Sequence, residues 1–108
     1  MTVKDTRLFL FATIIPKPEF YIVAREAVQS IIVPTLRESG CHVFAQFDCT
    51  DGSEKMYLFE IFESSDALDV HYEQNYTKTI FSNYQEWLVK PVEVIKLTPG
   101  SSVTSEQF

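Results

Sequence analysis

Glycine, cysteine and positive charge are all scarce in this sequence. The 108 residues include three glycines and two cysteines, and nine Lys and Arg stand against fifteen Asp and Glu, which gives a net charge of −6. Because the glycines do not cluster, there is no glycine-rich phosphate loop, and a nucleotide or flavin cofactor is not indicated. The acidic balance argues against nucleic acids and acidic membrane surfaces as partners, since both favour clustered Lys and Arg. The expected partners are small molecules or protein.

Long hydrophobic runs are missing as well. No apolar run approaches the roughly 20 residues that span a bilayer. The start of the chain, MTVKDTRLFLFATII, lacks the pattern of a cleavable signal, because its short apolar run is strand-like and is followed by Pro16. We therefore expect a cytoplasmic protein that does not bind membranes.

The two cysteines, Cys41 and Cys49, are too few for a disulfide scaffold. If both lie on one extended strand, eight residues at about 3.3 Å each separate them by roughly 26 Å, which is too far for one disulfide or one metal ion. His42 and Asp48 are expected to share a strand face with Phe44 and Gln46, but a metal site built on the two would lack a third ligand at suitable spacing. We expect reduced thiols and no metal.

Apolar residues, by contrast, are plentiful, at 45% of the chain. A chain of this size and composition has enough apolar material for the core of one compact domain. We expect residues 1–108 to form a single domain, with loose termini at 1–6 and 98–108.

Four strands follow from the apolar patterns. Residues 7–15 and 56–62 are almost continuously apolar, which predicts strands buried on both faces. Residues 41–49 and 92–97 alternate between apolar and polar, and the second of these predicts a more exposed strand.

Two helical regions lie between these strands. Helical spacing from Glu19 predicts a first helix that is interrupted near Pro34, with Pro34 acceptable as the first residue of a short second piece. Gly40 is expected to end this piece as a C-terminal cap. Ser64 or Ser65 offers an N-cap for a second helix and Asp66 a negative charge in its first turn. This helix extends or restarts toward Trp87. The order strand, helix, strand, strand, helix, strand is typical of the α+β ferredoxin-like plan, βαββαβ, with a four-stranded antiparallel sheet.

Two helices cover only one face of such a sheet. Strands 7–15 and 56–62 are nevertheless apolar on both faces, so the second face would expose more apolar surface than a soluble monomer usually tolerates. We therefore expect a homodimer in which two sheets stack into an α+β barrel, since closed two-fold pairing is the commonest symmetry.

The stretch from Met56 to Tyr72 carries the clearest candidate site. Glu60 is the only polar residue of its strand, and it shares a face with Leu58 and Phe62 that should look toward the helices. His71 lies on the apolar stripe of the following helix, turned toward the same strand. A carboxylate and an imidazole are thus predicted to share an apolar interior.

Three motifs resemble the antibiotic biosynthesis monooxygenase family. Val33 to His42, VPTLRESGCH, is similar to the "PTxxxEGC" link between helix one and strand two. Glu60 to Ser64 resembles the "E-x-W-x-S" end of strand three, and Ala67 to His71 resembles the "A-L-x-x-H" helix. Within the family, VPTLRESGCHVFAQFDC is most similar to the quinol monooxygenase branch. The resemblance implies a dimeric α+β barrel. Several members oxygenate quinols or phenolic polyketides without flavin, haem or metal, and others isomerise an autoinducer phosphate or have no established activity.

The sequence departs from the family pattern in informative places. The branch that degrades haem would need an Asn near Ala12, a Trp at Phe62 and a ligand His near Phe81, and all three are absent. Phe62 replaces the family Trp, so a role that needs an indole N–H is not available. Asn75 and Tyr76 stand where a His or similar residue is usual.

The motifs and the residue chemistry together suggest roles. His71 is the candidate base, since its reference pKa of about 6.5 suits proton removal near neutral pH; alternatively it is an interior histidine bonded to a backbone carbonyl. Glu60 would orient His71 or hold a substrate hydroxyl; alternatively it ties a backbone amide. The expected lining of the substrate pocket comprises Leu10, Ala12, Leu58, Phe62 and Tyr76.

The function expected from this pattern is a cofactor-independent monooxygenase of a quinol or related electron-rich phenolic, using O₂ as co-substrate. One alternative is a dimer that binds a small ligand, or is associated with stress, and has no turnover. Another is an isomerase of a small phosphorylated sugar, which ranks last because Arg7, Arg25, Arg37 and Lys78 are scattered through the sequence.

Overall fold

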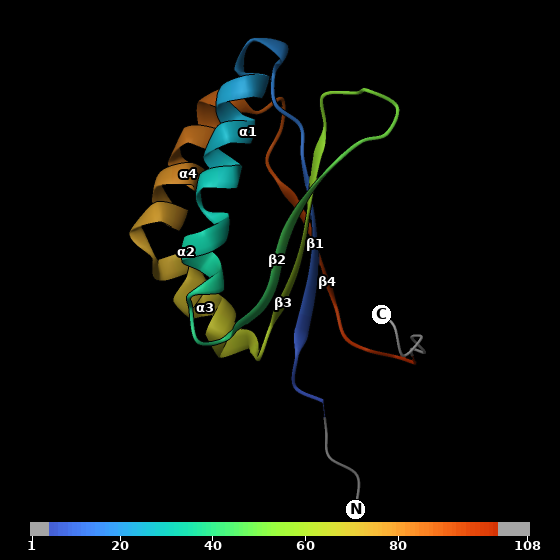
Figure 1. Cartoon of the computed structure of the whole chain (residues 1–108), viewed down its shortest axis with the longest axis vertical. Helices are drawn as coiled ribbons and strands as arrows, with labels where there is room; N and C mark the ends of the chain where they lie inside the picture. The colour runs from blue at the N-terminus through green and yellow to red at the C-terminus, as the bar shows by residue number, and fades with distance from the viewer. Residues whose placement is uncertain (1–4, 102–108) are drawn as a thin grey trace, which may run out of the picture.

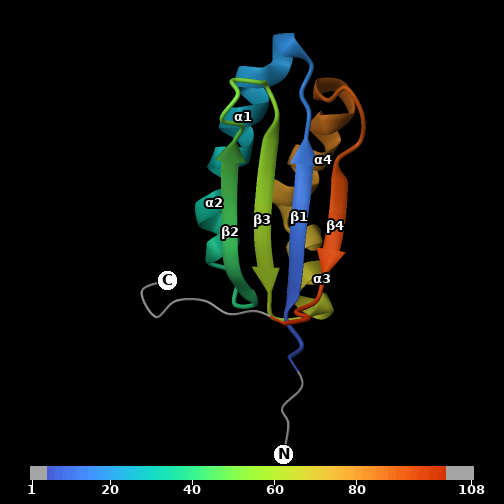
Figure 2. The ribbon, with the colours of Figure 1, turned by 90° about the vertical axis from the view of Figure 1, so that its right-hand side faces the viewer.

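The four predicted strands form one antiparallel sheet. The computed structural model describes residues 5–101. Its strands are β1 (Leu8–Ile14), β2 (Cys41–Asp48), β3 (Met56–Phe62) and β4 (Glu93–Leu97). Their order in the sheet is β2-β3-β1-β4, with β3 and β1 at the centre (Figure 2). This is the ferredoxin-like α+β topology that the order of elements predicted. The expected loose termini fall largely on residues 1–4 and 102–108, which lie outside the described part.

The helices all lie on one face of the sheet (Figure 1). A 3₁₀ turn at Pro18–Phe20 leads into α1 (Tyr21–Ser30) and α2 (Ile32–Leu36), and α3 (Ser65–Glu73) is followed by α4 (Asn75–Trp87). The first break falls at Ile31 and the second at Gln74, whose backbone is extended. The first helical region is therefore interrupted, as predicted, although Pro34 is the third residue of α2 rather than its first. The second region restarts rather than extends.

The core lies between the sheet and the helices. Every second residue of the central strands points into it, and Leu10, Ile14, Met56 and Phe62 have no exposed surface. This alternation explains why only one face of the apolar strands is fully buried within a single chain.

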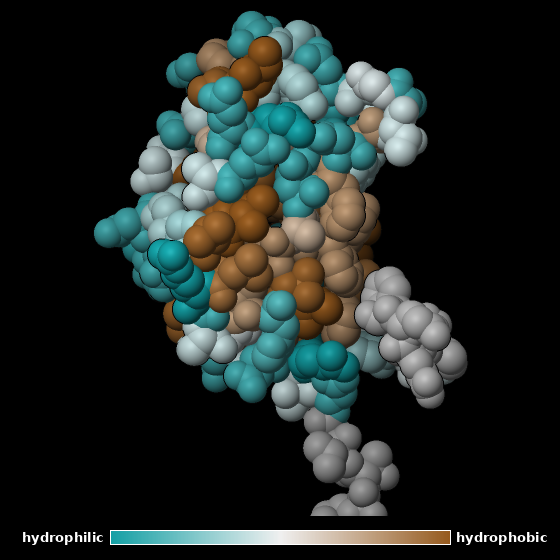
Figure 3. Space-filling view, viewed as in Figure 1, coloured by the Kyte–Doolittle hydropathy of each residue, from teal (hydrophilic) through white to brown (hydrophobic). Residues whose placement is uncertain are grey.

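No helix covers the opposite face of the sheet (Figure 2). Aromatic and aliphatic side chains lie on this face. Phe11 pairs with Phe59 across β1 and β3, and Phe11 retains 36% of its exposure. On the outer strands, Phe47 and Ile95 are more than half exposed. In Figure 3, apolar surface also runs across the middle of the molecule, from the helical layer onto the strands. We refer to the sheet surface opposite the helices, centred on Phe11 and Phe59, as the open face.

Two local predictions were wrong. Gly40 is not a left-handed helix cap, because Gly52 is the only glycine with positive φ among residues 5–101 and α2 already ends at Leu36. Gly40 is needed instead for close packing, since a Cβ at this position would collide with the Cβ of Ala67. His42 does not share a face with Phe44, because the pairing of β2 with β3 shifts between Cys41 and Val43 and leaves His42 exposed.

No helix within residues 5–101 is long and apolar enough to cross a bilayer.

Candidate functional site

Glu60 lies in the middle of the sheet with its side chain toward the helices. Its neighbours across the sheet are Leu10 on β1 and Phe44 on β2, and 6% of Glu60 is exposed. Burial raises the pKa of Glu60 from 4.5 to about 7, and the negative charge of Glu38 adds to the rise. Near neutral pH this carboxyl therefore exists in both the protonated and the charged form.

His71 reaches the same interior from the last turn of α3. The helix begins where the Ser64 hydroxyl accepts a hydrogen bond of 3.2 Å from the amide of Ala67, and Asp66 places a negative charge in the first turn. The imidazole is 3% exposed and packs against the rings of Phe44 and Phe62, at centroid distances of 5.5 and 5.2 Å. The helix start was predicted correctly from the serines and Asp66.

The partner of His71 is a carboxylate that the sequence reasoning missed. Nδ1 of His71 lies 2.9 Å from Oε2 of Glu38, in the turn that follows α2, and only 8% of the Glu38 side chain is exposed. The hydroxyl of Tyr76 donates to the same oxygen. Burial, together with this bond to Glu38, raises the pKa of Tyr76 to about 12, so the phenol stays a donor. Glu38 belongs to the VPTLRESGC segment, whose resemblance to the family link was the sequence signal that could have identified it.

The hydrogen bond to Glu38 determines the role left to the other ring nitrogen. A carboxylate only accepts hydrogen bonds, so Nδ1 carries a proton, and in the neutral imidazole Nε2 is then the acceptor. Nε2 has no hydrogen-bond partner among residues 5–101, and neither does the buried Oε1 of Glu38. This arrangement presents one basic nitrogen backed by a carboxylate.

Glu60 and His71 line one small cavity between the sheet and the helices, with a volume of about 30 Å³. We call it the inner chamber. Of the residues expected to line a substrate pocket, Ala12 and Leu58 border it. Leu10 and Phe62 are fully buried and do not, and the hydroxyl of Tyr76 is turned to Glu38. Substrate contacts by these residues stay predictions.

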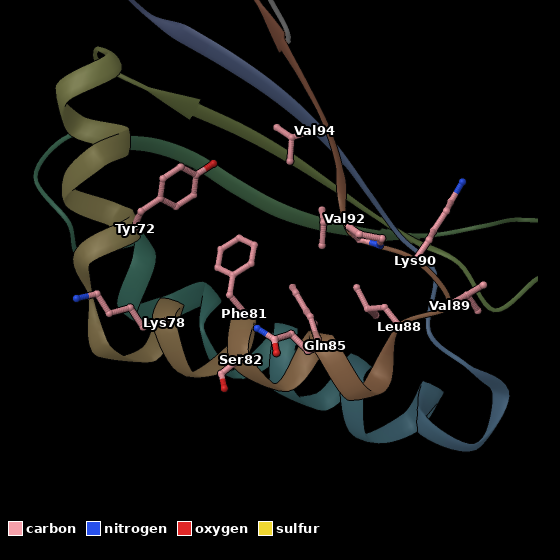
Figure 4. Close-up of a pocket in the computed structure, with 12 residues that line it drawn as sticks. Tyr72, Lys78, Phe81, Ser82, Gln85, Leu88, Val89, Lys90, Val92 and Val94 are labelled. Carbon is pink, nitrogen blue, oxygen red and sulfur yellow. The ribbon is translucent and has the colours of Figure 1, made fainter.

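A much larger concavity lies beside the inner chamber, between α4 and β4. This outer groove measures about 850 Å³. Figure 4 shows Phe81 and Leu88 pointing into it from the helical side, with Val92 and Val94 on the opposite wall. Five residues border both the outer groove and the inner chamber: Tyr72, Phe81, Tyr84, Val92 and Val94.

Metal ligands do not gather near this site. Within residues 5–101, no group of three or more His, Cys, Asp or Glu side chains is placed to hold a metal ion. Cys41 and Cys49 are both free thiols. Burial, followed by the charges of Glu38 and Glu60, raises the pKa of Cys41 to about 11, so this thiol is a poor nucleophile at neutral pH.

Comparison with known proteins agrees with this architecture. The family model for antibiotic biosynthesis monooxygenases matches residues 8–82. The chain is 31% identical over 90 residues to the "Putative monooxygenase Rv0793" of Mycobacterium tuberculosis, covering 83% of this chain and 88% of that protein. The solved structure of Rv0793 superimposes with a TM-score of 0.85, at 27% identity, over 92% of this chain and all of the other.

More distant structures share the fold. Protein PA3566 of Pseudomonas aeruginosa is 20% identical with a TM-score of 0.84, and the match covers 93% of this chain and 100% of that one. The motifs quoted above and the match over residues 8–82 lead to one conclusion. The chain belongs to the antibiotic biosynthesis monooxygenase family.

Proposed function

We propose that the protein is a monooxygenase of a quinol or related electron-rich phenolic, acting without flavin, haem or metal. The observation that carries this proposal is the Glu38–His71 hydrogen bond beside Glu60, all three side chains being buried. The name of the mycobacterial relative supports a monooxygenase in general. The narrower substrate class rests on the similarity of VPTLRESGCHVFAQFDC to the quinol monooxygenase branch.

In the proposed reaction, Nε2 of His71 takes a proton from a substrate hydroxyl or from an acidic C–H. The resulting anion is electron-rich enough to reduce O₂ directly. One oxygen atom forms the new C–O bond and the other leaves as water, and the substrate supplies all the electrons and protons. The protein contributes proton removal, positioning and exclusion of bulk water.

Glu38 and Glu60 divide the remaining tasks. Because Glu38 holds Nδ1 of His71, it is the residue that orients the base. Glu60 has no hydrogen bond to His71 and is partly protonated near neutral pH. It is therefore suited to hold the substrate hydroxyl and to donate a hydrogen bond as negative charge develops there.

Oxygen consumption tests the proposal directly. A reduced naphthoquinone should consume O₂ faster with the protein than by autoxidation alone, in the absence of added flavin or metal. Mass spectrometry with ¹⁸O₂ should find one labelled oxygen in the product. Equal rates with and without protein would sink the proposal.

A second candidate is a binding protein without turnover, and the size of the inner chamber favours it. A cavity of about 30 Å³ holds a water molecule, whereas a benzene ring occupies an engineered cavity of about 150 Å³. A phenolic that binds tightly in the outer groove without O₂ uptake would support this candidate over the monooxygenase.

The phosphorylated-sugar isomerase has less support. Arg7 and Arg25 form ion pairs with Asp5 and Asp48, outside the outer groove. Lys78 borders the outer groove, but it is exposed and pairs with Glu73. Within residues 5–101, no cluster of basic side chains near His71 is therefore placed to bind a phosphate.

The proposed working form is a homodimer in which two open faces stack. The support is the row of apolar side chains there, which includes the stacked rings of Phe11 and Tyr57 at 5.4 Å. Burial of such a face in a single chain would need a third layer, and residues 5–101 place all their helices on the other side.

A further inference from the structure

Three aromatic side chains stand between the outer groove and the inner chamber: Tyr72, Phe81 and Tyr84. Phe81 is the middle one. Its ring centroid lies 5.9 Å from that of Tyr72 and 5.6 Å from that of Tyr84, in edge-on contacts of 79° and 84°. Figure 4 shows its ring extending from α4 toward the sheet, between Tyr72 and Val92.

These three rings differ in how firmly they are held. Tyr84 is 8% exposed and belongs to the core, and Tyr72 is partly buried against it. Phe81 is 41% exposed, although it borders the inner chamber. A side chain with that much exposure changes rotamer quickly and loses little packing when it does. Phe81 is therefore the movable part of this wall.

The volumes on the two sides explain why movement matters. The outer groove of about 850 Å³ accommodates a substituted ring, and the inner chamber of about 30 Å³ does not. A ring that approaches His71 must displace whatever separates the two spaces. Val92 and Val94 also border both, but their side chains are short and are carried by β4. Phe81 is the most exposed of the three aromatic side chains in this wall, so its rotation opens the wall without moving the backbone or the core.

We infer that Phe81 is the gate between the outer groove and the inner chamber, and that its size determines which rings reach Glu60 and His71. The incoming ring takes over the edge contacts that Phe81 makes with Tyr72 and Tyr84, so opening loses little aromatic packing. The inference rests on the proposed function only in placing the chemistry at His71.

An anaerobic titration with 2-naphthol tests the gate without turnover. The chain has two histidines, and His42 is exposed on β2, so imidazole NMR signals report separately on the site and on a remote position. In the native protein the His71 signals should shift on titration and those of His42 should not. Phe81→Ala should lower the 2-naphthol concentration at the midpoint of the His71 shift by about tenfold, within the usual range for reshaping an apolar pocket.

Phe81→Trp provides the opposite change. The larger ring should suppress the His71 shift while 2-naphthol still binds in the outer groove, as measured by equilibrium dialysis. Ile22→Ala, at a residue of α1 that is 70% exposed and borders neither space, should titrate like the native protein. Thermal unfolding of each variant establishes that the fold is retained, and the exposure of Phe81 makes a large loss unexpected.

Two results would overturn the gate. One is a His71 response with the same midpoint in the native protein, Phe81→Ala and Phe81→Trp. The other is a complete lack of His71 response in Phe81→Ala, because the ring then never reaches the inner chamber. Since the titration needs no O₂, a working gate without oxygen uptake would remove the proposed reaction alone.

Discussion

At the scale of single residues, His71 has two possible roles, as a catalytic base or as a structural residue of the core. The sequence left two alternatives, a catalytic base or an interior histidine bonded to a backbone carbonyl. The bond from Nδ1 goes to the Glu38 carboxylate at 2.9 Å, a charge-assisted partner that suits either a base or a rigid core. Kinetics and stability therefore have to be measured on the same variants.

His71→Gln keeps similar size and an N–H for Glu38 but cannot act as the base. It should lower the rate of oxygen uptake by about 10² to 10⁴, the usual effect of losing general base catalysis, while the free energy of unfolding changes little. If His71→Gln instead loses about 1 to 3 kcal/mol of stability and turns over normally when folded, His71 is a core residue.

Glu38→Gln is the companion variant. It preserves shape and removes the charge behind Nδ1, so kcat should fall by more than about tenfold while KM stays nearly constant, as expected for a residue that acts through the base. Equal changes in kcat and KM would point to altered substrate binding instead.

Glu60→Gln tests the buried carboxyl through the pH dependence of stability. Because the folded pKa of about 7 is higher than 4.5, the folded state binds the proton more tightly. The resulting stabilisation is fully present below pH 4.5 and is lost as the pH rises through 7. Over this pH range the free energy of unfolding of the native protein should therefore fall by about 3 kcal/mol relative to that of Glu60→Gln.

Urea unfolding of both proteins at several pH values measures this difference. Glu63→Gln, at an exposed carboxylate just beyond β3, is the matched control and should follow the native curve. Parallel curves for the native protein and Glu60→Gln would show that Glu60 does not titrate in this window.

At the scale of elements, the contact between the turn after α2 and the start of α3 positions the site. Gly40, two residues after Glu38, lies against Ala67, which is four residues before His71. The backbone amide of Glu63 also donates to the Gly40 carbonyl at 2.8 Å, which ties the end of β3 to this turn. The Glu38–His71 distance therefore depends on this close approach.

Gly40→Ala should destabilise the fold by about 1 to 3 kcal/mol, because its Cβ collides with that of Ala67. Ala67→Gly removes the second methyl group at a cost of about 0.5 to 1 kcal/mol in a helix. The double variant should be more stable than the sum of the single changes predicts, as measured by urea unfolding. Additive effects would show that the turn moves freely to accept the methyl group.

At the scale of the whole molecule, the open face decides the assembly. Phe11→Asp or Phe59→Asp would place a charge in the proposed dimer interface, where its desolvation is costly. Either variant should be monomeric or aggregated in sedimentation velocity, whereas Ile22→Asp on the helical side should sediment like the native protein. A native protein that sediments as a folded, soluble monomer would refute the proposed dimer.

The sequence by itself determined the elements and their order. Continuous or alternating apolar residues reflect burial of one or two strand faces, and Ser64 with Asp66 marks a helix start, because these effects act between residues close in the chain. The same periodicity placed Glu60 and His71 toward one interior. What local patterns cannot encode is the path of a turn, so Gly40 was read as a cap and the bulge at His42 was missed.

Tertiary structure alone decided what surrounds that pair. Glu38 precedes His71 by 33 residues, and the packing of Gly40 on Ala67, with the bond from the Glu63 amide to the Gly40 carbonyl, helps to bring the two side chains within 2.9 Å. Likewise the inner chamber, the outer groove and the position of Phe81 depend on how α3 and α4 cross the sheet on either side of Gln74. Distances between segments remote in sequence follow from side-chain packing in three dimensions, to which periodicity along the chain is blind.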